Sequence, residues 1–194
     1  MMVDIINTII SSILTALYQP FWFTLILSIL FMFVYMMYPN IKSAAVQWIN
    51  WFKESVFFRK LFLLVFVTVI ILFRTLLNRD MWANPLSDIM GGWTLYDKEG
   101  ELTTEAIENF FMLVPFVFLL FWTYKDKLFK KVRLKGVLVY SFGIAFFCSI
   151  SIEFLQLLLR LGTFQLSDIV YNTLGGITGG LVYWLFYRIL KNKR

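Results

Sequence analysis

Residues 149–180 read SISIEFLQLLLRLGTFQLSDIVYNTLGGITGG, and this stretch decides the fold. Two apolar runs flank the short connection 161–167, so the helices that they predict are antiparallel neighbours. The second run carries two overlapping GxxxG patterns, formed by Gly175, Gly176, Gly179 and Gly180. Small residues at this spacing let helices approach closely. We expect the glycines to pack against the preceding helix, with contact between two copies of the chain as the alternative.

The rest of the chain is equally apolar. Of its 194 residues, 60% are hydrophobic and 15% are charged, and the mean hydropathy is +0.75. A soluble domain contains about a quarter charged residues, and a chain this apolar has too little polar surface to cover a water-exposed globule. The composition therefore predicts an all-α, polytopic membrane protein.

Five stretches are apolar enough to span a membrane, which takes about 20 residues. They are residues 20–38, 61–77, 109–124, 136–159 and 169–187. Pro115 lies inside the third stretch and predicts a kink there, with a role in how that helix packs.

Two further segments, residues 3–17 and 42–60, have one apolar and one polar face and are expected to lie in a membrane interface. For residues 3–17 the alternative is part of a long or re-entrant first span. The chain thus divides into an N-terminal part, residues 1–60, and a helical bundle, residues 61–194.

Charge predicts the orientation. Lysine and arginine concentrate in residues 41–60, 125–135 and 188–194, whereas residues 78–108 are mainly acidic. Because cytoplasmic loops of membrane proteins are rich in lysine and arginine, we expect the N-terminus outside and the C-terminus in the cytoplasm. The net charge of +6 then reflects topology and attraction to anionic membrane lipids. Nucleic-acid binding is not expected, because it would need one continuous basic face.

The residue types also exclude several chemistries. The chain has no histidine and one cysteine, which excludes Ser-His-Asp hydrolysis, histidine-ligated zinc and internal disulfides. We predict no metal site and no cofactor, and no residue stands out as a catalytic nucleophile. Any chemistry must use carboxylates, amides, hydroxyls, arginine or lysine.

Polar residues inside spans are energetically expensive and are functional candidates by default. Seven of them fall at the outer side of the predicted membrane: Arg74, Asn109, Glu153, Gln156, Arg160, Asp168 and Asn172. We expect them to form an outward-opening cleft in which Arg74 and Arg160 hold a phosphate or carboxylate. Glu153, which shares a helical face with Gln156 and Arg160, would orient the arginines, bind an ammonium group or carry a proton.

A purely structural alternative stays open for the same residues. Arg74 and Glu153 would form an ion pair that closes the bundle, and Asp168 would cap the last helix.

Three motifs make the sequence similar to the VanZ-like family of bacterial membrane proteins. They are Asn109-x5-Pro115, Ser149-x3-Glu153-x2-Gln156 and Asp168-x3-Asn172-Thr173-Leu174-Gly175-Gly176 followed by Gly179. The resemblance covers residues 61–187, with Arg74 as a less specific match. It implies a cell-membrane protein that lowers susceptibility to teicoplanin-type glycopeptide antibiotics, and it implies no agreed mechanism.

Three functions remain open from the sequence. The first is binding of a lipid-like ligand in the outer cleft, either a phospholipid, a cell-wall lipid precursor or the acyl-bearing antibiotic. The second is a hydrolase or transferase that acts on cell-wall lipids, with Glu153 and Asp168 as the acid/base pair. The third is a lipid transporter, which would need polar residues continuing through the inner half of the spans, where the sequence is almost wholly apolar.

Overall fold

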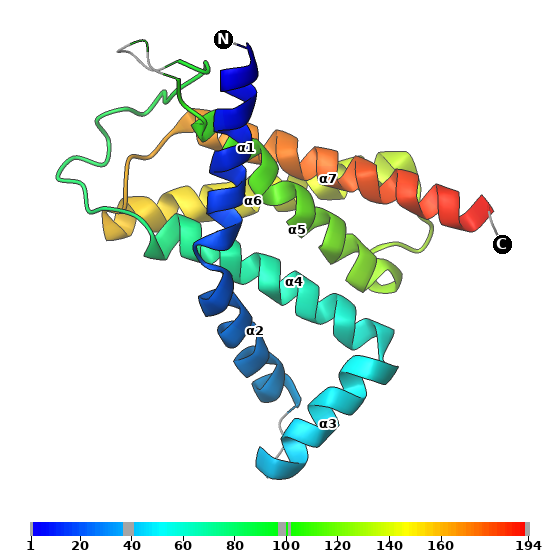
Figure 1. Cartoon of the computed structure of the whole chain (residues 1–194). Helices are drawn as coiled ribbons and strands as arrows, with labels where there is room; N and C mark the ends of the chain where they lie inside the picture. Colours follow the sequence, from blue (N-terminus) through cyan, green and yellow to red (C-terminus); the bar gives the residue numbers. More distant parts are fainter. Residues whose placement is uncertain (1, 37–40, 97–99, 101, 193–194) are drawn as a thin grey trace.

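The structure is a computed structural model, and it describes residues 2–36, 41–96, 100 and 102–192. Its helices are α1 (Met2–Tyr18), α2 (Phe21–Met36), α3 (Ile41–Glu54), α4 (Val56–Leu72), the π-helical turn η1 (Phe73–Leu77), α5 (Glu105–Leu128), α6 (Leu134–Leu159) and α7 (Leu166–Asn192). In Figure 1, α4 to α7 run side by side, while α1 and α2 run across their direction.

Four helices among the described residues are long and apolar enough to cross a membrane. They are α4 continued by η1 (Val56–Leu77), α5, α6 and α7. The all-α polytopic architecture predicted from composition is therefore confirmed. Each predicted span from residue 61 onward corresponds to one of these helices, although α5 begins four residues before the predicted start at Asn109.

The described part of the first predicted span, residues 20–38, is too short to count as a spanning helix by itself. Its described part, α2, has 16 residues, and α1 and α2 reach spanning length only together, with a bend of 41° between them. The bend falls at Pro20, whose missing N–H interrupts the helical hydrogen bonds. The alternative in which residues 3–17 belong to a long or re-entrant first span is compatible with this geometry, although the joint helix is bent. Residues 37–38 lie outside the described part of the chain.

The amphipathic segment 42–60 is two helices and not one. Glu54 ends α3, and the Ser55 hydroxyl caps α4 by accepting a hydrogen bond from the Phe58 N–H at 3.2 Å. Trp48 of α3 stacks on Phe52 at 5.2 Å and meets Phe58 edge-on at 5.8 Å. The aromatic face of α3 thus packs on the start of α4.

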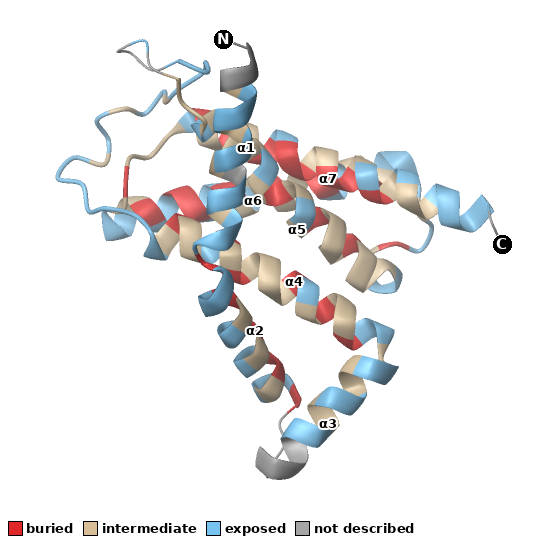
Figure 2. Ribbon diagram, in the orientation of Figure 1, coloured by how far each residue is buried: buried red, intermediate tan, exposed pale blue. Residues whose placement is uncertain are grey.

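The glycines of α7 allow both α5 and α6 to pack closely against this helix. A Cβ atom at Gly175 or Gly179 would collide with a backbone carbonyl oxygen of α5. One at Gly176 or Gly180 would collide with Ala145 or Ser141 of α6. Both GxxxG patterns therefore pack inside the molecule, and Figure 2 shows buried residues along α5, α6 and α7. The predicted contact with the preceding helix is confirmed, and the contact with α5 was not foreseen.

The predicted kink at Pro115 is wrong. Inside α5 the backbone leaves helical values at Tyr124, where φ is −109° and ψ is 24°, and not at Pro115. Pro115 lies exposed on α5, and the backbone around it keeps helical φ and ψ values. The irregular turn instead leads into the basic connection that precedes α6.

We predict that Gly179→Ala will lower the free energy of unfolding by about 1–3 kcal/mol, because the new methyl group must displace the Val114 carbonyl. The matched control is Gly143→Ala on α6, where a Cβ atom meets nothing within 4 Å. That change should be neutral or should stabilise the helix by about 0.5–1 kcal/mol. Thermal melting of the purified protein in detergent measures both, and equal melting temperatures would contradict the close packing of α7.

Candidate functional site

A polar cavity lies at the end of the bundle where α5 and α7 begin and η1 and α6 end. Its volume is about 640 Å³, within the range of ligand pockets in proteins. Six charged side chains line it: Arg74, Arg79, Asp88, Glu105, Glu108 and Asp168. Of the seven residues predicted from the sequence, Arg74, Asn109 and Asp168 line this cavity.

The π-helical turn η1 places Arg74 and ties α4 to α6. The Asn78 N–H donates to the Phe73 carbonyl at 2.8 Å, a hydrogen bond across five residues that defines a π turn. Within this turn, the Thr75 carbonyl accepts a hydrogen bond from Gln156 Nε2 at 2.9 Å. Gln156 is buried, so its amide joins two spans at the depth of the cavity.

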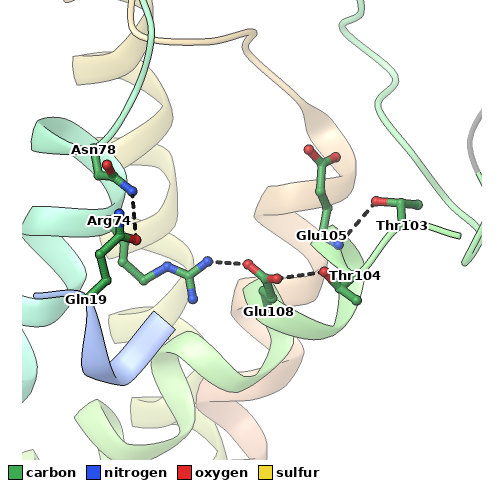
Figure 3. A network of polar contacts seen from close by, with 7 residues as sticks. All are labelled: Gln19, Arg74, Asn78, Thr103, Thr104, Glu105 and Glu108. Carbon is green, nitrogen blue, oxygen red and sulfur yellow. Dashed lines mark hydrogen bonds and ion pairs between the residues drawn. The ribbon is translucent and has the colours of Figure 1, made fainter. Parts of the chain in front are cut away.

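Arg74 forms an ion pair with Glu108 at the first turn of α5, as Figure 3 shows. The second carboxylate oxygen of Glu108 accepts a hydrogen bond from the Thr104 hydroxyl at 2.7 Å. Both charged side chains are mostly buried, with exposed fractions of 28% and 20%. The proposed ion pair between Arg74 and Glu153 is therefore wrong, because Glu108 takes the position next to Arg74.

Glu153 holds the connection between α6 and α7. Its side chain is buried, and Glu153 Oε2 accepts a hydrogen bond from the backbone N–H of Gln165 at 2.9 Å. The carboxylate lies near enough to Asp168 and Arg79 to interact with them electrostatically, but it does not line the cavity. Glu153 thus fixes the position of Gln165, which lines the cavity, without lining the cavity itself.

Asp168 lies in the first turn of α7, after the helix start at Leu166, so it is not the N-cap residue. Its carboxylate lies next to the Asn109 side chain and within electrostatic reach of Arg79 and Glu105. The backbone N–H groups at a helix N-terminus favour a negative charge at this place. Asp168 is therefore the predicted carboxylate that faces the cavity.

Asn172 lies one helical turn further along α7 and outside the cavity. Its Nδ2 donates to the Ser149 hydroxyl of α6 at 3.0 Å, and the side chain is buried. Asn172 therefore joins α6 to α7 in this structure, as Gln156 joins α6 to α4.

Arg160 leaves the helical face on which the sequence placed it. Helix α6 ends at Leu159, and Arg160 takes a left-handed conformation with φ of 57° at the helix C-terminus. Its side chain is exposed and does not line the cavity, and its carbonyl accepts a hydrogen bond from the Trp82 N–H at 2.8 Å. The chain reversal at the end of α6 is the physical reason for the difference.

In place of Arg160, the cavity contains an arginine from the loop that follows η1. Arg79 lines the cavity, and its guanidinium lies beside Gly162. Backbone hydrogen bonds fasten this loop to the α6–α7 connection: Trp82 N to Arg160 O, Gly162 N to Asp80 O, Phe164 N to Pro85 O and Leu166 N to Ile89 O. This ladder keeps Arg79 at the mouth of the bundle.

Sequence reasoning missed four charged residues of the site: Arg79, Asp88, Glu105 and Glu108. All four were assigned to the outer loop as orientation signals. Glu105 and Glu108 stand three residues apart just before an apolar run, and acidic residues are favoured in the first turn of a helix. That pattern could have moved the start of the third span back to residue 105. Nothing in the sequence distinguishes Arg79 from an ordinary loop arginine.

Within the part of the chain that the structure describes, no three carboxylate, cysteine or histidine side chains are grouped to hold a metal ion. The cavity instead offers guanidinium and carboxylate groups side by side. Such a set can bind a zwitterionic or charged organic group through hydrogen-bonded ion pairs.

Four apolar helices of spanning length with a mixed-charge cavity at one end define a polytopic helical membrane protein with a polar site at one end of its bundle. The VanZ/LLP1 family model matches residues 21–187, and the chain belongs to this family. The match starts at α2, so it includes α2 and α3, which the resemblance noted from residue 61 onward left outside. No curated protein and no solved structure matches the chain.

We predict that Arg74 and Glu108 stabilise the fold through their mutual contact. In a double-mutant cycle with Arg74→Gln and Glu108→Gln, the coupling energy should be about 1–2 kcal/mol, since both groups are mostly buried. The control pair is Lys125 and Asp126, 3.0 Å apart but more exposed. Its coupling should be about 0.5 kcal/mol or less, because solvent screens exposed pairs. Equal coupling in the two cycles, measured by thermal unfolding, would contradict this role.

Proposed function

We propose that this protein acts in the bacterial cell membrane and lowers susceptibility to teicoplanin-type glycopeptides by binding an amphiphile at the polar cavity. One observation supports this above the others: the polar cavity and an apolar groove share the Arg74–Glu108 ion pair. A ligand with a charged head and an acyl chain would fill both spaces.

The apolar groove has the size and lining that a hydrocarbon chain requires. Its volume is about 340 Å³, and it lies between α1, α4 and α5. Its apolar lining consists of Ala16, Leu17, Val67, Ile70, Ile71, Phe111, Met112, Val114 and Pro115. A chain that comes from the bilayer gains little from leaving water, so close packing against this apolar lining would hold it.

The charges of the cavity favour a head that carries an ammonium group. Four carboxylates and two guanidinium groups line the cavity, and one guanidinium, that of Arg74, is already bound to Glu108. Beside the Arg74–Glu108 pair, the cavity contains Glu105 and Asp168 against the single guanidinium of Arg79, and this balance would repel a purely anionic head and attract an amine. The guanidinium of Arg79 offers hydrogen-bond donors to a phosphate or carboxylate on the same ligand, so a zwitterionic head fits this set best.

The orientation of the protein in the membrane would place this cavity on the side from which the antibiotic arrives. The cavity lies beside the acidic segment 78–108, and the basic clusters lie at the other end of the bundle. With basic segments in the cytoplasm, the cavity opens at the outer leaflet, and the N-terminus is outside and the C-terminus inside. The ligand is then a phospholipid, a cell-wall lipid precursor or the antibiotic itself. Its capture would change what the teicoplanin acyl chain anchors to.

The enzyme alternative requires two carboxylates that reach the substrate together. Asp168 lines the cavity, whereas Glu153 is 2% exposed and already accepts a hydrogen bond from the Gln165 N–H. This geometry favours binding over acid/base chemistry by this pair. No observation favours a lipid transporter.

In cells that produce each variant at the wild-type membrane level, Arg79→Ala and Asp168→Asn should abolish most protection against teicoplanin. Each removes a charged group from the cavity, which should weaken ligand binding about tenfold or more. Lys53→Gln on the exposed face of α3 is the control for loss of one charge and should protect like wild type. If both cavity variants protect fully, the cavity is not the working part of the protein.

Binding measurements should show that the site prefers a ligand with an amine head and one acyl chain. In native mass spectrometry, lysophosphatidylethanolamine should bind more tightly than lysophosphatidylglycerol of the same chain length. Leu17→Trp, which fills the groove from α1, should weaken this binding, whereas Leu14→Trp, exposed on the same helix outside the groove, should not. Tighter binding of the glycerol lipid would contradict the charge argument, and equal effects of the two tryptophans would contradict the groove.

A further inference from the structure

A second cleft lies at the opposite end of the bundle. It has a volume of about 400 Å³ and is formed by the last turns of α5 and α7 and by the connection between α5 and α6. Helix α5 has 24 residues, so its two ends, and with them the two sites, are about 36 Å apart. The cleft is therefore independent of the polar cavity and of the function proposed for it.

Five cations and one acid line the cleft. They are Lys125, Lys130, Lys131, Arg133 and Lys191, with Asp126. Asp126 forms an ion pair with Lys125 at 3.0 Å. No other carboxylate lines the cleft among the described residues, so four cations there lack a carboxylate from the lining. A hollow with this excess of positive charge fits a compact anion.

The backbone that carries these cations is held in place by a buried aromatic anchor. Phe129 is 7% exposed and meets Phe121 edge-on at 5.0 Å, with Tyr183 stacked on it at 6.4 Å. Lys130 and Lys131 directly follow this anchor, and Arg133 has an extended backbone before α6. Because the anchor fixes the connection, the cations keep their positions around the cleft.

A buried hydroxyl group beneath the cleft lacks a hydrogen-bond partner. Tyr183 is 1% exposed, and its hydroxyl has no partner within the described part of the structure. Its ring stacks on Phe129 and on Tyr187, which both line the cleft. A buried polar group without a partner is destabilising. Tyr183 does not itself line the cleft, so it belongs to the aromatic layer beneath it, and Tyr187 is the tyrosine in the lining.

We propose that this cleft binds the phosphate-bearing headgroup of an anionic membrane lipid. The cleft is framed by the ends of two spans and by the connection to a third, which is the depth at which headgroups lie, and basic pockets between spans suit phosphate headgroups. Phosphate also offers the acceptor oxygens that lysine, arginine and a tyrosine hydroxyl require. With the orientation proposed above, the lipid belongs to the cytoplasmic leaflet.

The same basic segment provides a matched control. Lys127 and Lys135 carry the same charge in the same stretch of sequence, and neither lines the cleft. The Lys127 ammonium lies over the Tyr124 ring, 5.4 Å from its centre. If the basic residues act only through their total charge, removal of any two of them should lower the lipid affinity equally. If the cleft is a site, only removal of the lining residues should lower the affinity.

The test uses the full-length protein in detergent and two double variants, Lys131→Gln/Arg133→Gln in the cleft and Lys127→Gln/Lys135→Gln outside it. Native mass spectrometry measures binding of dihexanoyl phosphatidylglycerol, with dihexanoyl phosphatidylcholine and inorganic phosphate as comparison ligands. Thermal melting without lipid verifies that both variants fold.

The cleft variant should lose about thirtyfold in affinity for the glycerol lipid, at roughly fivefold for each cation removed. The control variant should bind like wild type, and wild type should prefer the glycerol lipid to both comparison ligands. Equal losses in the two variants would overturn the site in favour of nonspecific attraction. Equally tight binding of inorganic phosphate would overturn its assignment to a lipid headgroup.

Discussion

The close approach of α5 and α6 to α7 is the constraint on which the rest of the molecule depends. Hydrogen is the only side chain that fits where Gly175 and Gly179 meet the α5 backbone. Because α5 lies against α7 at these two points, the first turn of α5 comes to rest beside the first turn of α7. Asn109 then lies next to Asp168, and Glu105 lies within electrostatic reach of it. The charged cavity is thus a consequence of glycine packing further down the bundle.

Polar groups at this end of the bundle hold one another in position. Gln156 binds the Thr75 carbonyl, Glu153 accepts from the Gln165 N–H, and the Arg74–Glu108 pair joins η1 to α5. Each contact links two different elements, so the walls of the cavity are braced before any ligand arrives. The side chains of such a site are already ordered, so little binding free energy is lost in ordering them when a ligand enters. The same bracing explains why most polar groups in the spans occur at this end.

Hydropathy and glycine spacing predicted much of the fold, because both act locally. They located α6 and α7, their antiparallel pairing and the end of the bundle at which Asn109 and Asp168 meet. Details that depend on tertiary contacts escaped prediction. The chain reversal at Arg160, the π turn at Arg74 and the backbone ladder that brings in Arg79 are set by neighbours distant in sequence. Glu105 and Glu108 were missed for a simpler reason, since hydropathy placed the start of the third span at Asn109, after both carboxylates.

The central claim is that the cavity and the adjoining groove hold one amphiphile, and photo-crosslinking in living cells tests it most directly. A benzophenone side chain at Leu17 lines the groove, and the same side chain at Leu14, about one turn earlier on α1, lies outside the groove lining. Mass spectrometry of the adducts should show an amine-bearing amphiphile strongly enriched at Leu17 and the bulk membrane lipids at Leu14. Bulk lipids in the same proportions at both positions would contradict the claim.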